Sequence, residues 1–210
     1  MPLTPAWLPS SRLACVMLGL VGFTLSGCRT APAVEASLSE EEMMAQMMAA
    51  ATPGPMQAWL LEDVGTWKGD SRSWSAPGSE AYEMEASFTI VPRLGGRFTE
   101  CNYESEYPGM PRFEGIAITG YDNAAGEFQA MWIDSYGTTM MTGTGKRSDD
   151  GRAIEMTYSF YCPLRHRRVM LWQEIVRESP DRQTHRMWSE AMSDGSKYLM
   201  MEAHYRRAGS

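Results

Sequence analysis

The chain has 210 residues, a formal net charge of −7 at pH 7 and 43% hydrophobic residues. This length suits one main domain with a substantial core. The acidic balance, without a Lys/Arg cluster interleaved with aromatic residues, excludes nucleic-acid binding from the expected functions.

The first residues predict an export signal. Arg12 is the only charged residue before position 28, and an apolar run covers residues 13–25. A run of this length matches the hydrophobic region of a signal peptide and is short for a membrane-spanning helix. We therefore expect residues 1–27 to act as a cleaved signal peptide.

The sequence Leu-Ser-Gly-Cys at residues 25–28 resembles the lipobox of bacterial lipoproteins. The resemblance implies that Cys28 is acylated and becomes the new N-terminus, although an ordinary secretory signal with a chance cysteine is the alternative. Several acyl chains would anchor the protein firmly to a membrane. Arg29 follows the cysteine, which by resemblance to lipoprotein sorting favours the outer membrane, facing the periplasm.

A linker and a helix are expected next. Residues 28–38 are rich in Ala, Pro, Thr and Ser, a composition typical of a flexible linker. Residues 39–55 predict a short helix with Ser39 as N-cap and Glu42 as its capping-box partner. Four methionines on one helical face (Met43, Met44, Met47 and Met48) predict a packing surface, with Cu(I) ligation by thioethers as the alternative.

Residues 56–210 predict an all-β domain. Apolar and polar residues alternate with a period of two, and hairpin-turn signals such as Asp149-Asp150-Gly151 separate the segments. No crossover helix fits between segments, so we expect an antiparallel up-and-down barrel, with a two-sheet sandwich as the alternative. The segments indicate about ten strands: 64–75, 81–92, 96–105, 113–121, 126–134, 138–147, 152–161, 168–177, 183–192 and 197–207.

Gly65-Thr66-Trp67, at the start of the first strand, is similar to the glycine-x-tryptophan signature of calycins. The resemblance implies a calycin-like barrel in which Trp67 plugs one end and an arginine near the last strand packs across its indole ring. Arg206 and Arg207 are the candidates for this closure. Arg207 is favoured because it shares a strand face with apolar residues.

Several further stretches resemble an uncharacterised bacterial family, domain of unknown function 1579. They are residues 64–67, 94–98, 113–115, 120–123 and 132–138, in that order. The likeness covers about residues 56–207 and supports the barrel. The family implies no established activity and no agreed catalytic residues, so it leaves the function open.

A polar and aromatic cluster follows the strand that bears Trp132. Asp134, Ser135 and Tyr136 lie at the strand end, where a barrel mouth is expected, although Asp134 as a simple turn cap is the alternative. Together with Tyr158, these residues are the candidates for ligand binding. Cys101 and Cys162 either form a disulfide in the oxidising compartment or remain as two thiols.

The sequence favours binding over catalysis. It has no recognisable nucleophile elbow and no closely spaced histidine pair for a metal, so no catalytic or metal residues are assigned. Haem-binding nitrobindins are also ten-stranded barrels that open with glycine-threonine-tryptophan, and His204 or His185 would then be the ligand. We expect no cofactor.

The leading functional hypothesis is an envelope lipoprotein whose barrel binds a small apolar or amphipathic molecule. One alternative is a structural or interaction module of the envelope with a filled barrel. A hydrolase or isomerase that uses Asp134, Ser135 or glutamates at the mouth is the third. The sequence does not define the oligomeric state.

Overall fold

The computed structural model describes residues 38–107 and 109–209. The expected signal peptide, Cys28 and nearly all of the expected linker lie outside these residues. A compact unit begins at Ser39. Within the described part of the chain, no helix combines the length and apolarity needed to span a membrane.

Two helices precede the strands, α1 (Glu40–Ala51) and α2 (Pro55–Leu61). The predicted capping box is present, because Glu42 N donates to Ser39 Oγ (3.2 Å) and Ser39 N donates to Glu42 Oε2 (2.8 Å). Pro53 and Gly54 separate α1 from α2, and Pro55 occupies the first turn of α2, where its missing N–H leaves no bond unmade.

The expectation that the methionine face of α1 packs against the domain is wrong. α1 has no buried residue. The barrel holds this helix by its last carbonyls instead: Asn123 Nδ2 donates to the oxygens of Ala50 (3.1 Å) and Thr52 (2.8 Å). The methionines therefore stay in contact with solvent, with exposures between 45% and 68% for Met43, Met44, Met47 and Met48.

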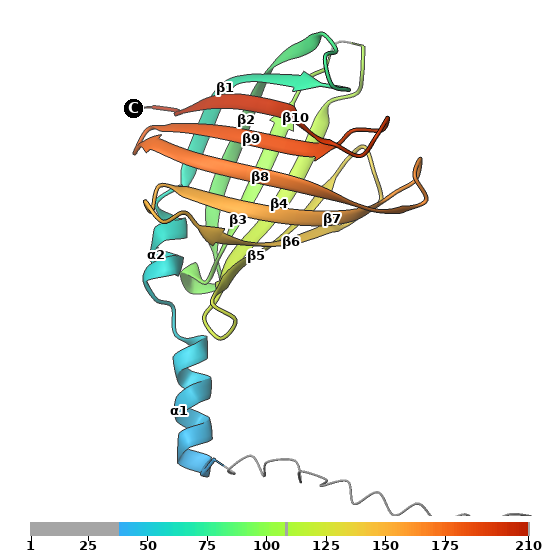
Figure 1. Ribbon diagram of the computed structural model, residues 1–210. Helices are drawn as coiled ribbons and strands as arrows, with labels where there is room; N and C mark the ends of the chain where they lie inside the picture. Colours follow the sequence, from blue (N-terminus) through green and yellow to red (C-terminus); the bar gives the residue numbers. More distant parts are fainter. Residues whose placement is uncertain (1–37, 108, 210) are drawn as a thin grey trace, which may run out of the picture. The chain divides into compact units, whose positions relative to one another are not determined.

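Ten antiparallel strands form a closed barrel in which each strand pairs with its sequence neighbours and β1 pairs with β10 (Figure 1). The predicted up-and-down barrel is confirmed, and the β1–β10 pairing removes the sandwich alternative. Each predicted strand overlaps the observed one: β1 (Gly65–Trp74), β2 (Ala81–Arg93), β3 (Phe98–Ser105), β4 (Phe113–Asp122), β5 (Glu127–Asp134), β6 (Met141–Arg147), β7 (Ala153–Cys162), β8 (Arg167–Ser179), β9 (Arg182–Glu190) and β10 (Lys197–Arg207).

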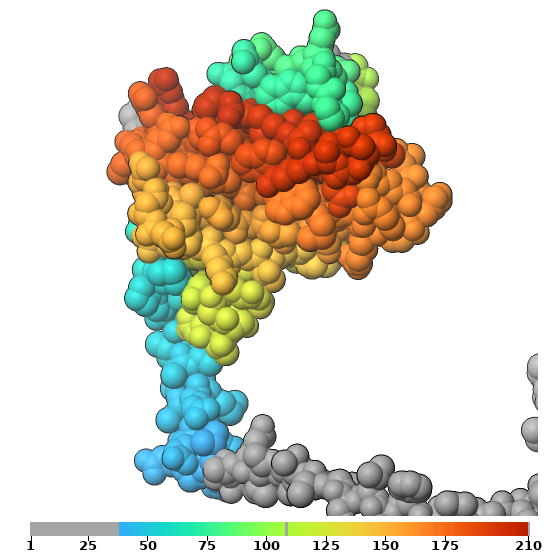
Figure 2. Space-filling view, viewed as in Figure 1, coloured from blue at the N-terminus to red at the C-terminus, as the bar shows by residue number. Residues whose placement is uncertain are grey.

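Alternation along the strands decides which side chains enter the barrel. On β2, Met84, Ala86 and Phe88 are buried while the residues between them are more exposed. Strands β7 to β10, orange to red in Figure 2, present their other face as a continuous outer wall. Between β2 and β3, the short 3-10 turn Leu94–Gly96 requires positive φ angles, which Gly95 (67°) and Gly96 (81°) adopt without strain.

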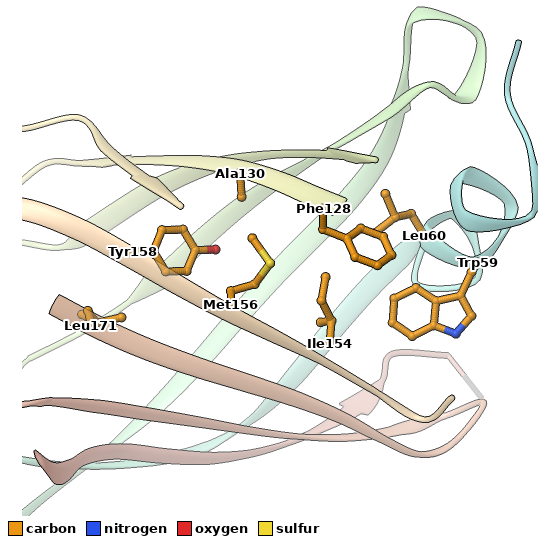
Figure 3. Close-up of a cluster of buried hydrophobic side chains, with 8 residues drawn as sticks. All are labelled: Trp59, Leu60, Phe128, Ala130, Ile154, Met156, Tyr158 and Leu171. Atoms are coloured by element: carbon orange, nitrogen blue, oxygen red, sulfur yellow. The ribbon is translucent and has the colours of Figure 1, made fainter. Parts of the chain in front are cut away.

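The two ends of the barrel differ. We call the end where β1 begins and β10 ends the closed end, and the opposite end the mouth. From the closed end along the barrel, residues of α2, β5, β7 and β8 form a buried apolar cluster (Figure 3): Trp59, Leu60, Phe128, Ala130, Ile154, Met156, Tyr158 and Leu171. A second cluster surrounds Trp67, which is fully buried.

Candidate ligand-binding site in the barrel interior

Trp67 and Arg207 lie together at the closed end. The Arg207 guanidinium carbon is 4.3 Å from the centre of the indole ring, a cation–π distance. Trp67 Nε1 donates to Asp63 O (2.9 Å), and Arg207 Nη1 donates to Val64 O (2.5 Å). The pair therefore joins the start of β1 to the end of β10.

A second arginine, Arg177, completes the closed end, and sequence reasoning missed it. Its guanidinium carbon lies 3.5 Å from the centre of the Trp59 ring. It also donates two hydrogen bonds to the carboxylate of Asp63, at 2.8 Å and 2.6 Å. Burial raises the pKa of Asp63, and the bonds from Arg177 offset part of that rise.

Asp63 also orients Gln183, which in turn orients His185. Gln183 Nε2 donates to Asp63 Oδ1 (2.6 Å), so Gln183 Oε1 faces His185 Nε2 at 3.0 Å. Because that oxygen only accepts, His185 Nε2 must carry the proton. Nδ1 is then an acceptor, and none of the described residues donates to it. Burial lowers the pKa of His185 to about 3, so the ring is neutral at pH 7.

The strand register places His185 inside the barrel. It faces Ala203 on β10 and Ile175 on β8, and its ring lies 5.5 Å from Phe88 and 4.8 Å from Tyr205. These neighbours all belong to the inward set, so the imidazole is surrounded by the barrel. Sequence reasoning named His185 as one of two candidate haem ligands but did not place it inside the barrel.

Beyond the closed end, some inward side chains are only half-buried. In a filled core, inward side chains lose nearly all their accessible surface. Here several inward side chains keep part of that surface, while others, such as Met84, Val169 and Leu171, are buried. We call the region around the half-buried inward side chains the interior recess. Its lining residues are Cys101, Tyr103, Ala117, Trp132, Gln173 and His185.

The recess is poorly solvated despite this accessible surface. Burial raises the pKa of the Cys101 thiol to about 12. Burial likewise raises the pKa of Tyr103 and that of Tyr205. At neutral pH the thiol and both phenols therefore keep their protons.

Three buried hydroxyl groups lie near the recess. They belong to Ser71, Ser105 and Tyr205. The Tyr103 hydroxyl interacts with those of Ser105 and Tyr205, whereas Ser71 Oγ has no partner among the described residues. A buried hydroxyl without a partner costs about 1–3 kcal/mol, so this wall of the barrel has unused hydrogen-bonding capacity.

At the mouth, the predicted cluster separates into different roles. Trp132 is the inward residue; its ring lies 6.0 Å from that of Tyr103, and its Nε1 donates to Asp134 Oδ2 (2.9 Å). Asp134 Oδ1 accepts from Tyr136 N (3.0 Å), which is a turn cap, and Ser135 Oγ accepts from Glu114 N (3.0 Å). The Asp134 carboxylate and the Ser135 hydroxyl thus stabilise the backbone at the mouth, while the Trp132 indole lines the mouth.

Tyr158 and Tyr136 also differ in position. Tyr158 is buried within the barrel, where its hydroxyl donates to Gln173 Oε1 (3.2 Å). Tyr136 is 43% exposed, and its hydroxyl donates to Pro111 O (2.6 Å). Of the five predicted ligand-binding residues, the structure places Trp132 and Tyr158 inside the barrel and the other three at its rim.

The two cysteines do not pair, and the second candidate haem ligand lies outside the recess. Cys101 and Cys162 carry free thiols, so the structure does not contain the disulfide that the sequence left open. His204, the other histidine considered as a haem ligand, lies on the outer wall with its side chain 63% exposed, and its Nδ1 is 2.9 Å from Thr184 Oγ1.

Two hollows lie outside the recess. One, of about 540 Å³, opens at the closed end beside Trp59, Asp63 and Arg177. Arg177 and Gln183 donate to both carboxylate oxygens of Asp63, so this carboxylate fixes the two side chains in place. The other, of about 800 Å³, is a hollow lined largely by charged residues, over β1, β2, β3 and β10.

A ten-stranded closed barrel with an arginine over a tryptophan at one end defines a calycin-like protein. A protein-family model described as "Protein of unknown function (DUF1579)" matches residues 52–207. The chain therefore belongs to this family, as its motifs suggested.

Among solved structures, the chain is similar to one described as "Crystal Structure of Rv2717c from M. tuberculosis". The TM-score is 0.58 at 15% sequence identity, over 74% of this chain and 99% of that one. At this identity the likeness concerns the fold alone. A search of curated proteins gave no match.

Proposed function

We propose that the barrel binds a small amphipathic molecule in its interior recess. The observation that carries this proposal is the half-buried state of inward residues such as Trp132, Ala117 and Gln173. Binding sites for small molecules are concave and mostly apolar, with a few polar groups that orient the ligand. The recess has this character, because aromatic and aliphatic side chains surround the hydroxyls of Tyr205 and Ser105.

A probe-binding measurement tests this function. N-phenyl-1-naphthylamine, an uncharged dye that fluoresces in apolar surroundings, would be titrated into the full chain. Ala117→Phe should reduce the affinity at least tenfold, because Ala117 faces the recess between Cys101 and Trp132 and a benzyl group there would fill it. Ile116→Phe is the matched control, since Ile116 is its outward neighbour and 39% exposed.

The outcome decides between a recess and a filled barrel. Binding that Ala117→Phe abolishes and Ile116→Phe preserves supports the proposal, provided that both variants melt near the parent temperature. If the dye does not bind, or binds equally to both variants, the interior is not the site.

We further propose that Cys28 is acylated and tethers this barrel to the outer membrane, facing the periplasm. The support is the lipobox-like sequence at residues 25–28, with Arg29 after it. Expression in a bacterial host fed an alkyne-labelled palmitate tests it: the parent chain should carry the label and sediment with outer membranes, and Cys28→Ala should do neither. An unlabelled parent chain would contradict the tether without affecting the proposal for the barrel.

A further inference from the structure

We propose that the interior recess selects uncharged ligands whose polar group is a hydroxyl, and that it discriminates against carboxylates of the same chain length. This inference rests on the proposed binding function and specifies its ligand class. The expected selectivity follows from the positions of the charged side chains in the barrel and from the hydrogen-bonding groups that line the recess.

Charged side chains enter the described barrel only near its two ends. Arg147, Arg177 and Arg207 are inward at the closed end, while Asp134 and Arg167 are at the mouth, by the strand register. Between these ends the inward side chains are apolar residues, hydroxyls, amides, the Cys101 thiol and His185. The recess therefore offers no formal charge to pair with an anion or a cation.

The arginines at the closed end already have partners. Arg177 is bound to Asp63 and Glu62, and Arg207 donates to backbone oxygens of Val64 and Glu62. The Arg147 guanidinium lies 5.3 Å from the Trp59 ring and donates to Gly151 O (2.9 Å). A carboxylate in the recess would consequently lose its hydration without gaining a counter-charge, which is strongly unfavourable.

The wall offers one fixed acceptor, His185 Nδ1, and one neighbouring hydroxyl, that of Tyr205. The bonds from Asp63 through Gln183 hold the proton on His185 Nε2, so Nδ1 can only accept. The ring of Tyr205 is 4.8 Å from the His185 ring, and its buried hydroxyl interacts with that of Tyr103. A ligand hydroxyl can donate to Nδ1 and accept from Tyr205, whereas a carboxylate or a ketone can only accept.

Displacement of N-phenyl-1-naphthylamine by ligands of one chain length measures this selectivity. At pH 8 we expect 1-decanol to bind at least tenfold more tightly than decanoate or decylammonium. As the pH falls toward 5, decanoate becomes protonated and its apparent affinity should rise, while that of decanol stays constant because His185 remains neutral.

Two variants connect the selectivity to the named groups. Tyr205→Phe removes a hydroxyl that can donate to the ligand, so the affinity for decanol should fall about fivefold; the melting temperature of the variant checks that it folds. His185→Phe should lower the decanol affinity about tenfold and leave that of 1-bromodecane, which has no hydroxyl, unchanged. Tyr82→Phe and His204→Phe are matched controls, because Tyr82 is 60% exposed and His204 lies on the outer wall.

Different results would contradict the proposed selectivity and the proposed binding function. If decanoate at pH 8 binds as tightly as decanol, or if Tyr205→Phe and His185→Phe leave the preference for decanol over bromodecane intact, the ligand class proposed here is wrong although the recess binds. If neither the dye nor any of these ligands binds in a manner sensitive to Ala117→Phe, the proposed function fails, and this inference with it.

Discussion

The closed end and the interior recess lie in the same barrel, yet they use polar groups in opposite ways. At the closed end every prominent charge is paired: Asp63 with Arg177, and Arg207 with backbone oxygens beside Trp67. In the recess none of the described side chains is charged, and none of them donates to His185 Nδ1. The comparison indicates that the closed end provides stability, while the recess retains unused hydrogen-bonding capacity for a ligand.

The largest expected difference in stability is between variants that lack the tryptophan of one region or of the other. Trp67→Ala should lower the free energy of unfolding by about 3–5 kcal/mol, because this indole is fully buried. Trp132→Ala should cost only about 1–2 kcal/mol, since Trp132 is half-buried, but should weaken dye binding. Urea unfolding and dye titration on both variants measure the contrast, and equal stability losses would contradict it.

Breaking the ion pair at the closed end should have a smaller but still large effect. Arg177→Met leaves Asp63 charged and enclosed, and we expect a loss of about 3 kcal/mol. The double variant Arg177→Met/Asp63→Asn should recover at least half of that loss in urea unfolding. Arg72→Met is the control, because Arg72 and Glu83 are both exposed and their pair contributes little. No recovery in the double variant would show that the charge on Asp63 is not the cause.

A glycine on the recess wall provides the next prediction. A Cβ at Gly115 would lie 2.2 Å from Cζ2 of Trp132, so Gly115→Ala should displace that ring and cost about 1–3 kcal/mol. Dye affinity should fall with it. Gly137→Ala is the matched control, because a Cβ there meets its nearest neighbours at an ordinary 3.8 Å. If the two alanine variants behave alike, the Trp132 ring does not rest on Gly115.

The smallest expected effect concerns pH. His185 has a folded-state pKa of about 3 and an ordinary value of 6.5, so the unfolded chain binds the extra proton first as the pH falls. Stability should therefore decrease below pH 6.5, with a contribution of about 1 kcal/mol per pH unit from this residue.

Urea unfolding of the parent chain and of His185→Phe at pH 7, 6 and 5 measures that contribution. The variant should show a correspondingly shallower loss of stability as the pH falls, whereas His204→Phe should keep the parent slope. Identical slopes for all three chains would show that His185 is not held neutral by burial.

The strand positions were predictable because alternation and turn residues are local signals. The alternation around Met84, Ala86 and Phe88 and the turn at Asp149-Asp150-Gly151 need no knowledge of distant contacts. The packing of α1 was not predictable in this way. Its methionine spacing is compatible with a buried face, but only the tertiary structure shows that the barrel contacts the helix through its C-terminal carbonyls.

The closed end was predictable in part and the recess hardly at all. Trp67 and Arg207 belong to a recognisable motif, whereas Arg177 meets Asp63 across more than a hundred residues of sequence. The roles of Gln183 and His185 were not predictable either, because they depend on the carboxylate of Asp63 and on the strand register. Polar residues at the inward positions of β9 were the one available signal.

A crystal structure of the protein grown with 10-bromo-1-decanol tests the central claim most directly. We predict one anomalous bromine peak along the barrel interior, with the hydroxyl of the ligand within hydrogen-bonding distance of His185 Nδ1 and the Tyr205 hydroxyl. A barrel filled by its own side chains, with bromine only in the outer hollows beside Trp59 or over β1 and β2, would contradict it.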